Sequence, residues 1–188
     1  MDLILKGIVT GFILSIMIGP VFFVLLEISI RKGFKAGIAF DIGVLLNDFV
    51  YILIAYVFFN QVELLSSGDD NSILKIIGGV MFFIYGFFTF FKKIEDSFID
   101  NNDMQTETDL KGYILLGLKG FLLNLANPMI LFYWFSVMTL VPEYSSFGEN
   151  NITMFVFIAS ILSSFFLVDL LKIFGAKSLR PLVTAKLL

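Results

Sequence analysis

Two carboxylates in one long apolar stretch are the first candidates for chemistry in this chain. Asp48 lies roughly midway along residues 34–59, and Asp41 stands seven residues before it. At 3.6 residues per turn, a helix places both side chains on nearly the same face. An ionised carboxylate at mid-depth in a bilayer is costly and usually serves a function. Since the chain has no histidine, which is the usual proton shuttle, we interpret Asp48 as a candidate proton carrier.

Each aspartate also has a plainer interpretation. Asp48 could stay neutral and merely tie two helices together, although its depth favours a functional role. Asp41 could guide protons or an ammonium group toward the middle of the membrane, or it could lie near the interface and pair with Arg31 or Lys35. The sequence does not distinguish these two roles of Asp41.

A second set of candidates surrounds a proline in the middle of residues 112–141. Asn124 and Asn127 precede Pro128, which removes a backbone donor and frees a carbonyl one turn earlier. Amide side chains both donate and accept hydrogen bonds. Freed carbonyls and carboxylates suit an ammonium group, and the N-terminus of a broken helix suits a carboxylate, so the set suits a zwitterion. Alternatively, the two asparagines hydrogen-bond between helices and have only a structural role.

The first proline break, Gly19-Pro20, interrupts residues 7–30 and has similar surroundings. The letters GFIL that begin at Gly11 lead into it, as the letters GFLL that begin at Gly120 lead into the other break. Ser15 lies about one turn before Gly19 and joins the candidates. Interrupted apolar segments at matching positions of two halves indicate the binding site of a secondary transporter. The chain therefore looks like a duplicated unit.

The composition places these residues in an integral membrane protein. Of the 188 residues, 58% are hydrophobic and 15% are charged, and the mean hydropathy is +0.93. The chain has no cysteine and no histidine, which excludes disulfides, thiolate or haem ligation and most zinc sites. It contains no Gly-x4-Gly-Lys-Ser/Thr loop, and its hydrophilic loops are too short for a catalytic domain. We therefore expect no metal, no cofactor, no nucleic-acid partner and no enzymatic activity.

The apolar stretches that must position the candidate residues predict an all-α fold. Five of them reach about 20 residues, the length that spans a bilayer, namely residues 7–30, 34–59, 73–91, 112–141 and 152–171. The fourth is overlong, so we expect it to tilt or to begin with an interfacial turn. The first is too long for a signal peptide and should remain in the mature protein.

Charge predicts how these spans are oriented. The first and third loops and the chain after the fifth span carry Lys and Arg residues, whereas the second and fourth loops carry acidic residues and no Lys or Arg. By the positive-inside rule, the N-terminus should be extracytoplasmic and the loops with Lys and Arg cytoplasmic. The basic residues concerned are Arg31, Lys32, Lys35, Lys92, Lys93, Lys111, Lys172, Lys177, Arg180 and Lys186.

The polar segment 92–111 is the natural linker between two halves. Residues 1–91 would form a first repeat of three helices, and residues 112–188 a second repeat of opposite orientation. An inverted 3+3 repeat needs a sixth span, and only five are predicted here. We therefore expect the second repeat to lack its last helix, as in a truncated chain.

Three motifs occur in order along these spans. They are GFILSIMIGP over residues 11–20, spaced glycines that end in Asn47-Asp48, and FLLNLANPM over residues 121–129. In these motifs, and over essentially its whole length, the chain resembles the LysE/RhtB family of amino-acid exporters, which usually have about six spans. The family pattern has proline, glycine and lysine where this chain has Ile18, Asn47 and Met129.

The resemblance implies a secondary transporter of the bacterial cytoplasmic (inner) membrane. We expect it to export amino acids or similar small zwitterions, driven by proton exchange. Its partners would be an amino acid, a coupling ion and the lipid bilayer, and a homodimer could complete the second half. The residues that we expect to bind substrate or proton, or to line the site as helix breaks, are Asp48, Asp41, Asn47, Asn124, Asn127, Ser15, Gly19, Pro20 and Pro128.

Two other functions stay open. A divalent-cation exporter of the same superfold would use Asp41, Asp48 and the asparagines as hard oxygen ligands. A truncated, non-transporting membrane subunit would account for the absent sixth span. An intramembrane aspartyl enzyme is disfavoured, because the rise of a helix separates Asp41 and Asp48 by about 10 Å, which is too far to share a proton.

Other polar and aromatic residues receive structural interpretations. Glu27 with Arg31, and Asp169 with Lys172, have the spacing of salt bridges on a helix surface. We expect both pairs near the membrane interface. Trp134 falls in the outer half of the fourth span. An aromatic gate at this position is only a speculation.

Overall fold

The computed structural model describes residues 2–17, 19–66, 109–140 and 151–184, together with the single positions 76, 80 and 83. Within these residues the only regular secondary structure is helical. The helices, in chain order, are α1 (Asp2–Ile16), α2 (Pro20–Lys32), α3 (Phe34–Ser66), α5 (Leu110–Leu125), α6 (Pro128–Leu140) and α7 (Asn151–Thr184). The all-α fold is therefore confirmed for the part of the chain that the structure describes.

The described helices include both straight and bent candidates for membrane spans. Two helices are long and apolar enough to cross a membrane alone, over Phe34–Phe58 in α3 and Ile152–Ala176 in α7. The pairs α1 with α2 and α5 with α6 qualify only together, and they are bent by 77° and 71°. Such helices agree with a multi-pass membrane protein. Apart from positions 76, 80 and 83, the predicted third span (73–91) and most of the linker (92–111) lie outside the described residues, so the count of five spans and the inverted repeat stay predictions.

The two prolines end helices where the sequence predicted breaks. The helix α1 stops at Ile16 and α2 begins at Pro20. Likewise, α5 stops at Leu125 and α6 begins at Pro128. Proline is favoured at the first position of a helix, because its ring fixes φ and its missing N–H would have no partner there. Both breaks are confirmed, and the fourth predicted span is overlong because it consists of two helices.

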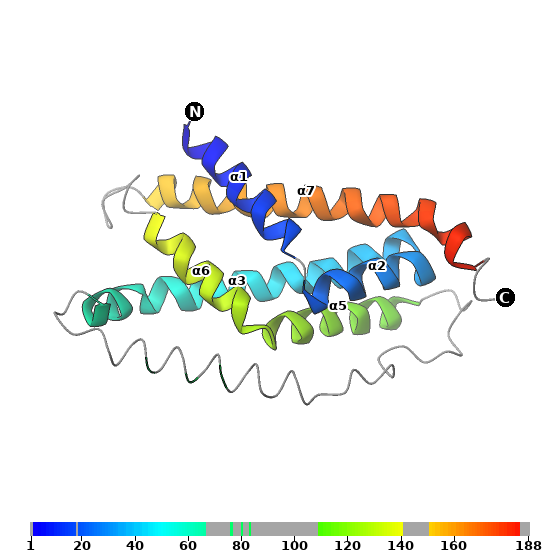
Figure 1. The fold of residues 1–188 in the computed structure, drawn as a ribbon, viewed down its shortest axis with the longest axis horizontal. Helices are drawn as coiled ribbons and strands as arrows, with labels where there is room; N and C mark the ends of the chain where they lie inside the picture. The colour runs from blue at the N-terminus through cyan, green and yellow to red at the C-terminus, as the bar shows by residue number, and fades with distance from the viewer. Residues whose placement is uncertain are drawn as a thin grey trace.

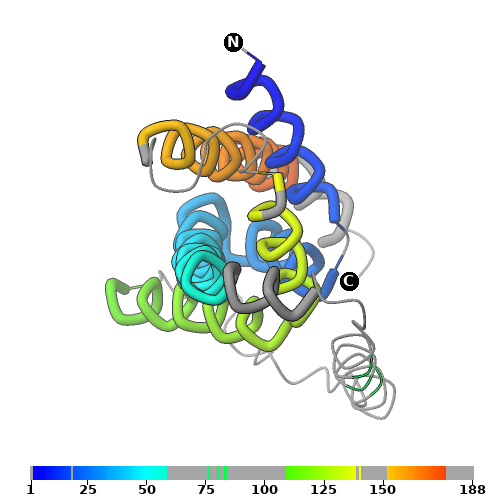
Figure 2. Tube along the Cα trace, turned by 90° about the vertical axis from the view of Figure 1, so that its left-hand side faces the viewer, coloured from blue at the N-terminus to red at the C-terminus, as the bar shows by residue number. Residues whose placement is uncertain are grey.

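The helix α3 is the central element of the bundle. In Figures 1 and 2, α7 lies along one side of α3 and α5 along the other, and α3 contacts both. The first helix, α1, packs mainly on α7, whereas α2 contacts both α3 and α7. Since α6 also contacts α3, both bent pairs are held against the same helix.

The charge pattern predicts that three segments lie on the same side of the membrane, and in the structure these segments lie at one end of the molecule. In Figure 1, the turn between α2 and α3, the start of α5 and the end of α7 are all at the right. Gly33 makes the first of these turns with φ 88°, a left-handed conformation that favours glycine. Which of the two ends faces the cytoplasm stays a prediction of the positive-inside rule.

Glycines let α3 and α5 approach closely where they cross. A Cβ atom on Gly43 would overlap the backbone carbonyl of Gly117, and one on Gly120 would overlap the backbone of Phe40. Small residues at helix crossings in membranes allow such contact between backbones. The crossing therefore fixes the relative position of the polar residues that follow on both helices.

The helix α1 is held in place by a second close contact. A Cβ atom on Gly7 or Gly11 would overlap atoms of α7. From α6, the Tyr133 hydroxyl donates a hydrogen bond to the backbone carbonyl of Thr10 at 2.9 Å. These contacts hold the middle of α1 against α6 and α7.

Candidate functional site

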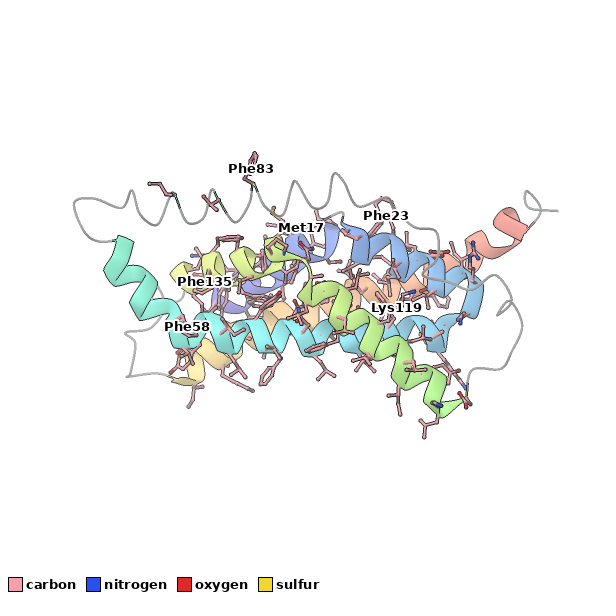
Figure 3. All side chains as sticks on the ribbon, turned by 90° about the horizontal axis from the view of Figure 1, so that it is seen from below. Met17, Phe23, Phe58, Phe83, Lys119 and Phe135 are labelled. Atoms are coloured by element: carbon pink, nitrogen blue, oxygen red, sulfur yellow. The ribbon has the colours of Figure 1, made fainter. Side chains whose placement is uncertain are left out.

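A small cavity lies where the two helix breaks meet. Its volume is about 50 Å³, which is enough for a few water molecules. The side-chain amide of Asn127, at the second break, lies next to Gly19, at the first. Figure 3 shows Met17, another lining residue, beside the chain that joins α5 to α6. The polar side chains that line the cavity are Ser15, Asp48, Asn124, Asn127, Asp169 and Lys172.

Most of the predicted site residues come together at this cavity. Those that line it are Ser15, Gly19, Asp48, Asn124 and Asn127. Pro20 and Pro128 begin the helices that directly follow two of these lining residues. Asp41 and Asn47 are not among the lining residues, although both lie on α3.

Asp48 is buried at the cavity and held by side chains from two other helices. Its Oδ1 accepts hydrogen bonds from Asn124 Nδ2 at 3.0 Å and from Trp134 Nε1 at 3.3 Å. Asn124 Nδ2 also donates to the backbone carbonyl of Val44 at 3.3 Å. Because Asp48 is only 1% exposed, such donors are what stabilises its carboxylate. Asp48 ties α3 to α5 and α6, as its plainer interpretation expected, and it also faces the cavity.

Asp169 and Lys172 form an ion pair inside the site. Asp169 Oδ1 lies 2.7 Å from Lys172 Nζ, and the two side chains are 6% and 16% exposed. Asp169 Oδ1 also accepts a hydrogen bond from Ser15 Oγ at 2.9 Å, and Lys172 Nζ donates to the Ser15 carbonyl. The pair is as predicted, and it lies within the bundle, where both residues line the cavity. Its depth relative to the membrane interface stays a prediction.

Asp41 is buried without a hydrogen bond. It is 0% exposed, and its carboxyl oxygens have no hydrogen-bond partner in the part of the chain that the structure describes. The alternative prediction, a pair with Arg31 or Lys35, is therefore wrong. Arg31 pairs instead with Glu27 at 3.2 Å, which confirms that predicted pair.

The charged surroundings of Asp41 connect it to the site. Among charged groups, Asp169 interacts with it most strongly, followed by Asp48 and then Lys172. Three carboxyl groups and one ammonium group are thus close enough to influence one another. When all four are ionised the group is negative, so it attracts cations such as a proton or an ammonium group.

Asn47 is buried away from the cavity. Its side chain is 0% exposed, and among the described residues its amide has no hydrogen-bond partner. Its polar neighbour is Tyr51, one turn later. The Tyr51 hydroxyl donates at 2.7 Å to the carbonyl of Leu125, the last residue of α5. The structure thus does not bring Asn47 to the cavity, and Tyr51 satisfies a carbonyl freed by the second break.

The two broken helices present different N-termini to the cavity. At α6, Asn127 Oδ1 accepts a hydrogen bond from the Met129 N–H at 3.1 Å and so caps the helix. At α2, the N-cap residue is Gly19, which has no side chain to offer. The first turn of α2 includes the lining residues Val21 and Phe22. Its N–H groups lack a side-chain cap and form the positive end of the helix dipole.

Three residues of the site were missed by sequence reasoning: Trp134, Asp169 and Lys172. Trp134 is 0% exposed and donates to Asp48, a contact that the sequence reasoning did not foresee. A buried indole N–H needs an acceptor, and Asp48 is the acidic residue at the middle of an apolar span. That requirement could have linked the two. For the ion pair the sequence holds no such signal, because the apolar stretch ends at residue 171 while the helix does not.

Metal ligands are sparse in this site. Within the described residues, no group of three or more histidine, cysteine, aspartate or glutamate side chains is arranged to hold a metal ion. The alternative of a divalent-cation exporter therefore has no ligand cluster in its favour.

Comparison with known proteins gives one family and one relative. The sequence profile of the family described as LysE type translocator matches residues 12–188. A protein of Bacillus subtilis (strain 168) with the name "Putative amino acid efflux protein YcgF" is 23% identical over 188 residues, which are all of this chain and 87% of that protein. No solved structure matches the chain significantly.

Proposed function

Because the chain belongs to the LysE type translocator family, whose members are membrane transporters, we propose that it exports amino acids or similar small zwitterions across the bacterial cytoplasmic membrane. Its similarity to a protein named for amino acid efflux supports this class of substrate. The observation that carries the proposal is the position of Asp48, a buried carboxylate that faces a cavity between two helix breaks.

The substrate's ammonium group binds at Asp48. A carboxylate in an apolar bundle has lost its hydration. A cation stabilises it more than a neutral group does, because the opposite charge compensates for the lost water. Asn124 and Trp134 both donate to Oδ1 and so fix the orientation of the carboxyl group. Asn127 lies on the same cavity and offers a further polar contact at the second break.

The substrate's carboxylate binds at the N-terminus of α2. The N–H groups of its first turn carry no side-chain cap, and they border the cavity through Val21 and Phe22. Free N–H groups and the helix dipole together favour an anion at this position. An amino acid therefore lies between α2 and α3 with its two charges in opposite directions.

The coupling ion is the proton, and Asp48 is its binding group. A proton and an ammonium group each neutralise the same carboxylate, so the two compete for it. Loading of one therefore releases the other, which is what exchange of an outgoing amino acid for an incoming proton requires. The chain has no histidine, so the proton must pass through carboxyl groups or water.

Substrate reaches this site only after the helices move apart. The cavity of about 50 Å³ holds a few water molecules and no more. The two bent pairs meet there, and their hinges are the short segments before Pro20 and Pro128. Opening at one hinge or the other would expose the cavity to one side of the membrane at a time.

An efflux experiment tests the proposal. Cells that express the chain are loaded with a panel of dipeptides, and the amino acids released to the medium are measured by mass spectrometry. We expect the wild type to release one or a few amino acids faster than cells with an empty vector. Asp48→Asn should fall to the vector level at equal membrane abundance, because an amide neither takes up a proton nor balances an ammonium group.

Asp109→Asn is the matched control. Asp109 Oδ1 caps α5 by accepting a hydrogen bond from the Gly112 N–H at 2.8 Å, and asparagine caps helices equally well. This variant should export at the wild-type rate. Wild-type export by Asp48→Asn would refute the role of that carboxylate. No export of any amino acid by well-inserted wild type would refute the class of substrate.

A further inference from the structure

We propose that Lys172 is the side chain that binds the carboxylate of the transported zwitterion, and that Asp169 is its partner while no substrate is bound. This inference rests on the proposed function and narrows it to substrates that carry a free carboxylate beside their ammonium group. Amides, esters and simple amines of the same shape would be poor substrates.

The charges that line the cavity single out Lys172. Among the described residues that line it, Asp48 and Asp169 are acidic and Lys172 alone is basic. A zwitterion in this cavity needs one group of each sign. Asp48 supplies the negative group for the ammonium, and Lys172 is then the available side chain for the carboxylate.

The position of Lys172 matches the N-terminus of α2. Its Nζ lies 5.2 Å from the centre of the Phe22 ring, and Phe22 is in the first turn of α2, where the N–H groups have no side-chain cap. A helix N-terminus alone binds anions weakly, and an adjacent ammonium group adds a charge-assisted hydrogen bond. Both features border one cavity, so a single carboxylate can use both.

The existing contacts allow Lys172 to change partner while Asp169 keeps a hydrogen bond. Lys172 Nζ now contacts Asp169 Oδ1 at 2.7 Å and the Ser15 carbonyl. If Lys172 turns to a substrate carboxylate, Asp169 keeps its hydrogen bond from Ser15 Oγ at 2.9 Å. A zwitterion brings no net charge, so its entry changes the charge of the site only by the proton that Asp48 releases. Asp169 therefore balances the charge of Lys172 while the site is empty. When a zwitterion binds, its carboxylate replaces Asp169 as the partner of Lys172.

Competition in proteoliposomes tests the inference. The purified full chain exchanges the radiolabelled form of the amino acid that leaves cells fastest, against either the same unlabelled amino acid or its carboxamide (leucinamide in the case of leucine). The carboxamide keeps the ammonium group and the side chain but has no carboxylate. Wild type should prefer the amino acid by about ten-fold or more, the factor for one hydrogen bond to a charged group.

The variants show which side chain recognises the carboxylate. Lys172→Gln should weaken competition by the amino acid about ten-fold and leave that of the carboxamide unchanged, so the preference disappears. Lys172→Arg should keep much of the preference, because guanidinium groups also bind carboxylates. Lys111→Gln is the control, since Lys111 is exposed at the start of α5. The double variant Asp169→Asn/Lys172→Gln removes both charges, so it tests recognition without leaving Asp169 unpaired.

The outcomes separate the two proposals. If Lys172→Gln or the double variant keeps the ten-fold preference, the role of Lys172 is overturned while amino acid export stands. If wild type exchanges no amino acid at all, both are overturned. Loss of the preference in both variants, with its retention in Lys111→Gln, supports the inference.

Discussion

Replacing Gly43 by alanine should separate α3 from α5 and weaken both the fold and the site. At this position an added Cβ atom would overlap the backbone carbonyl of Gly117. A backbone atom cannot turn away as the end of a flexible side chain can, so the two helices themselves must move. Non-bonded heavy atoms rest about 3.5 Å apart, and relief therefore requires a shift of roughly 1 Å or more.

The cost of this shift has two parts. Overpacking of this kind costs about 1–3 kcal/mol of unfolding free energy. The same shift acts on the bond from Asn124 Nδ2 to Asp48 Oδ1, which is 3.0 Å long in the native bundle. A lengthening of about 1 Å takes it out of hydrogen-bond range. Amino acid export should therefore fall together with stability.

Thermal unfolding of the purified chain in detergent measures the first part, and the dipeptide efflux assay measures the second. The matched control is Gly175→Ala on α7, where an added Cβ atom meets nothing within 4 Å. It should leave stability unchanged or raise it by up to about 1 kcal/mol through helix propensity. For a chain of this size each kcal/mol shifts Tm by about 2–4 °C. Equal Tm values for the two variants would refute the reasoning about the α3–α5 contact.

Two further predictions concern hydrogen bonds in the site. Trp134→Phe keeps a large ring but removes the N–H that donates to Asp48, so it should lower stability by about 1 kcal/mol and slow export; a variant as stable and as active as wild type would show that this bond contributes nothing. Asp169→Asn and Lys172→Gln should each lower the unfolding free energy, and the sum of their two effects should exceed the effect of the double variant by a coupling energy of about 1–3 kcal/mol. Additive effects would contradict a buried, mutually dependent pair.

The sequence predicted the breaks because proline has a local effect. Pro20 and Pro128 begin helices in the structure, as the loss of a backbone donor dictates. The bends of 77° and 71° at these breaks could not be predicted in the same way. They depend on what the second helix of each pair packs against, which is long-range information.

The sequence predicted which residues belong to the site better than it predicted which of them contact one another. A carboxylate or an amide in an apolar span needs a partner, so Asp48 and Asn124 could be chosen from sequence, but their bond joins residues 76 positions apart. Asp169 and Lys172 could not be chosen, since their spacing on one helix is also that of an ordinary surface salt bridge. What distinguishes the two cases is whether a neighbour covers the pair. Here the end of α1 does so through Ser15.

The two helix breaks differ in the groups that they offer to a ligand. At the second break, Asn127 already accepts from the first turn of α6, so that helix end has little left to offer an anion. At the first break, glycine leaves the first turn of α2 without a side-chain cap, and Lys172 lies beside it. The groups that we propose to bind the substrate carboxylate therefore belong to α2 and α7, whereas the acceptor Asp48 and its donors belong to α3, α5 and α6. A zwitterion bound across the cavity would join these two groups of helices, and its departure would free them to separate.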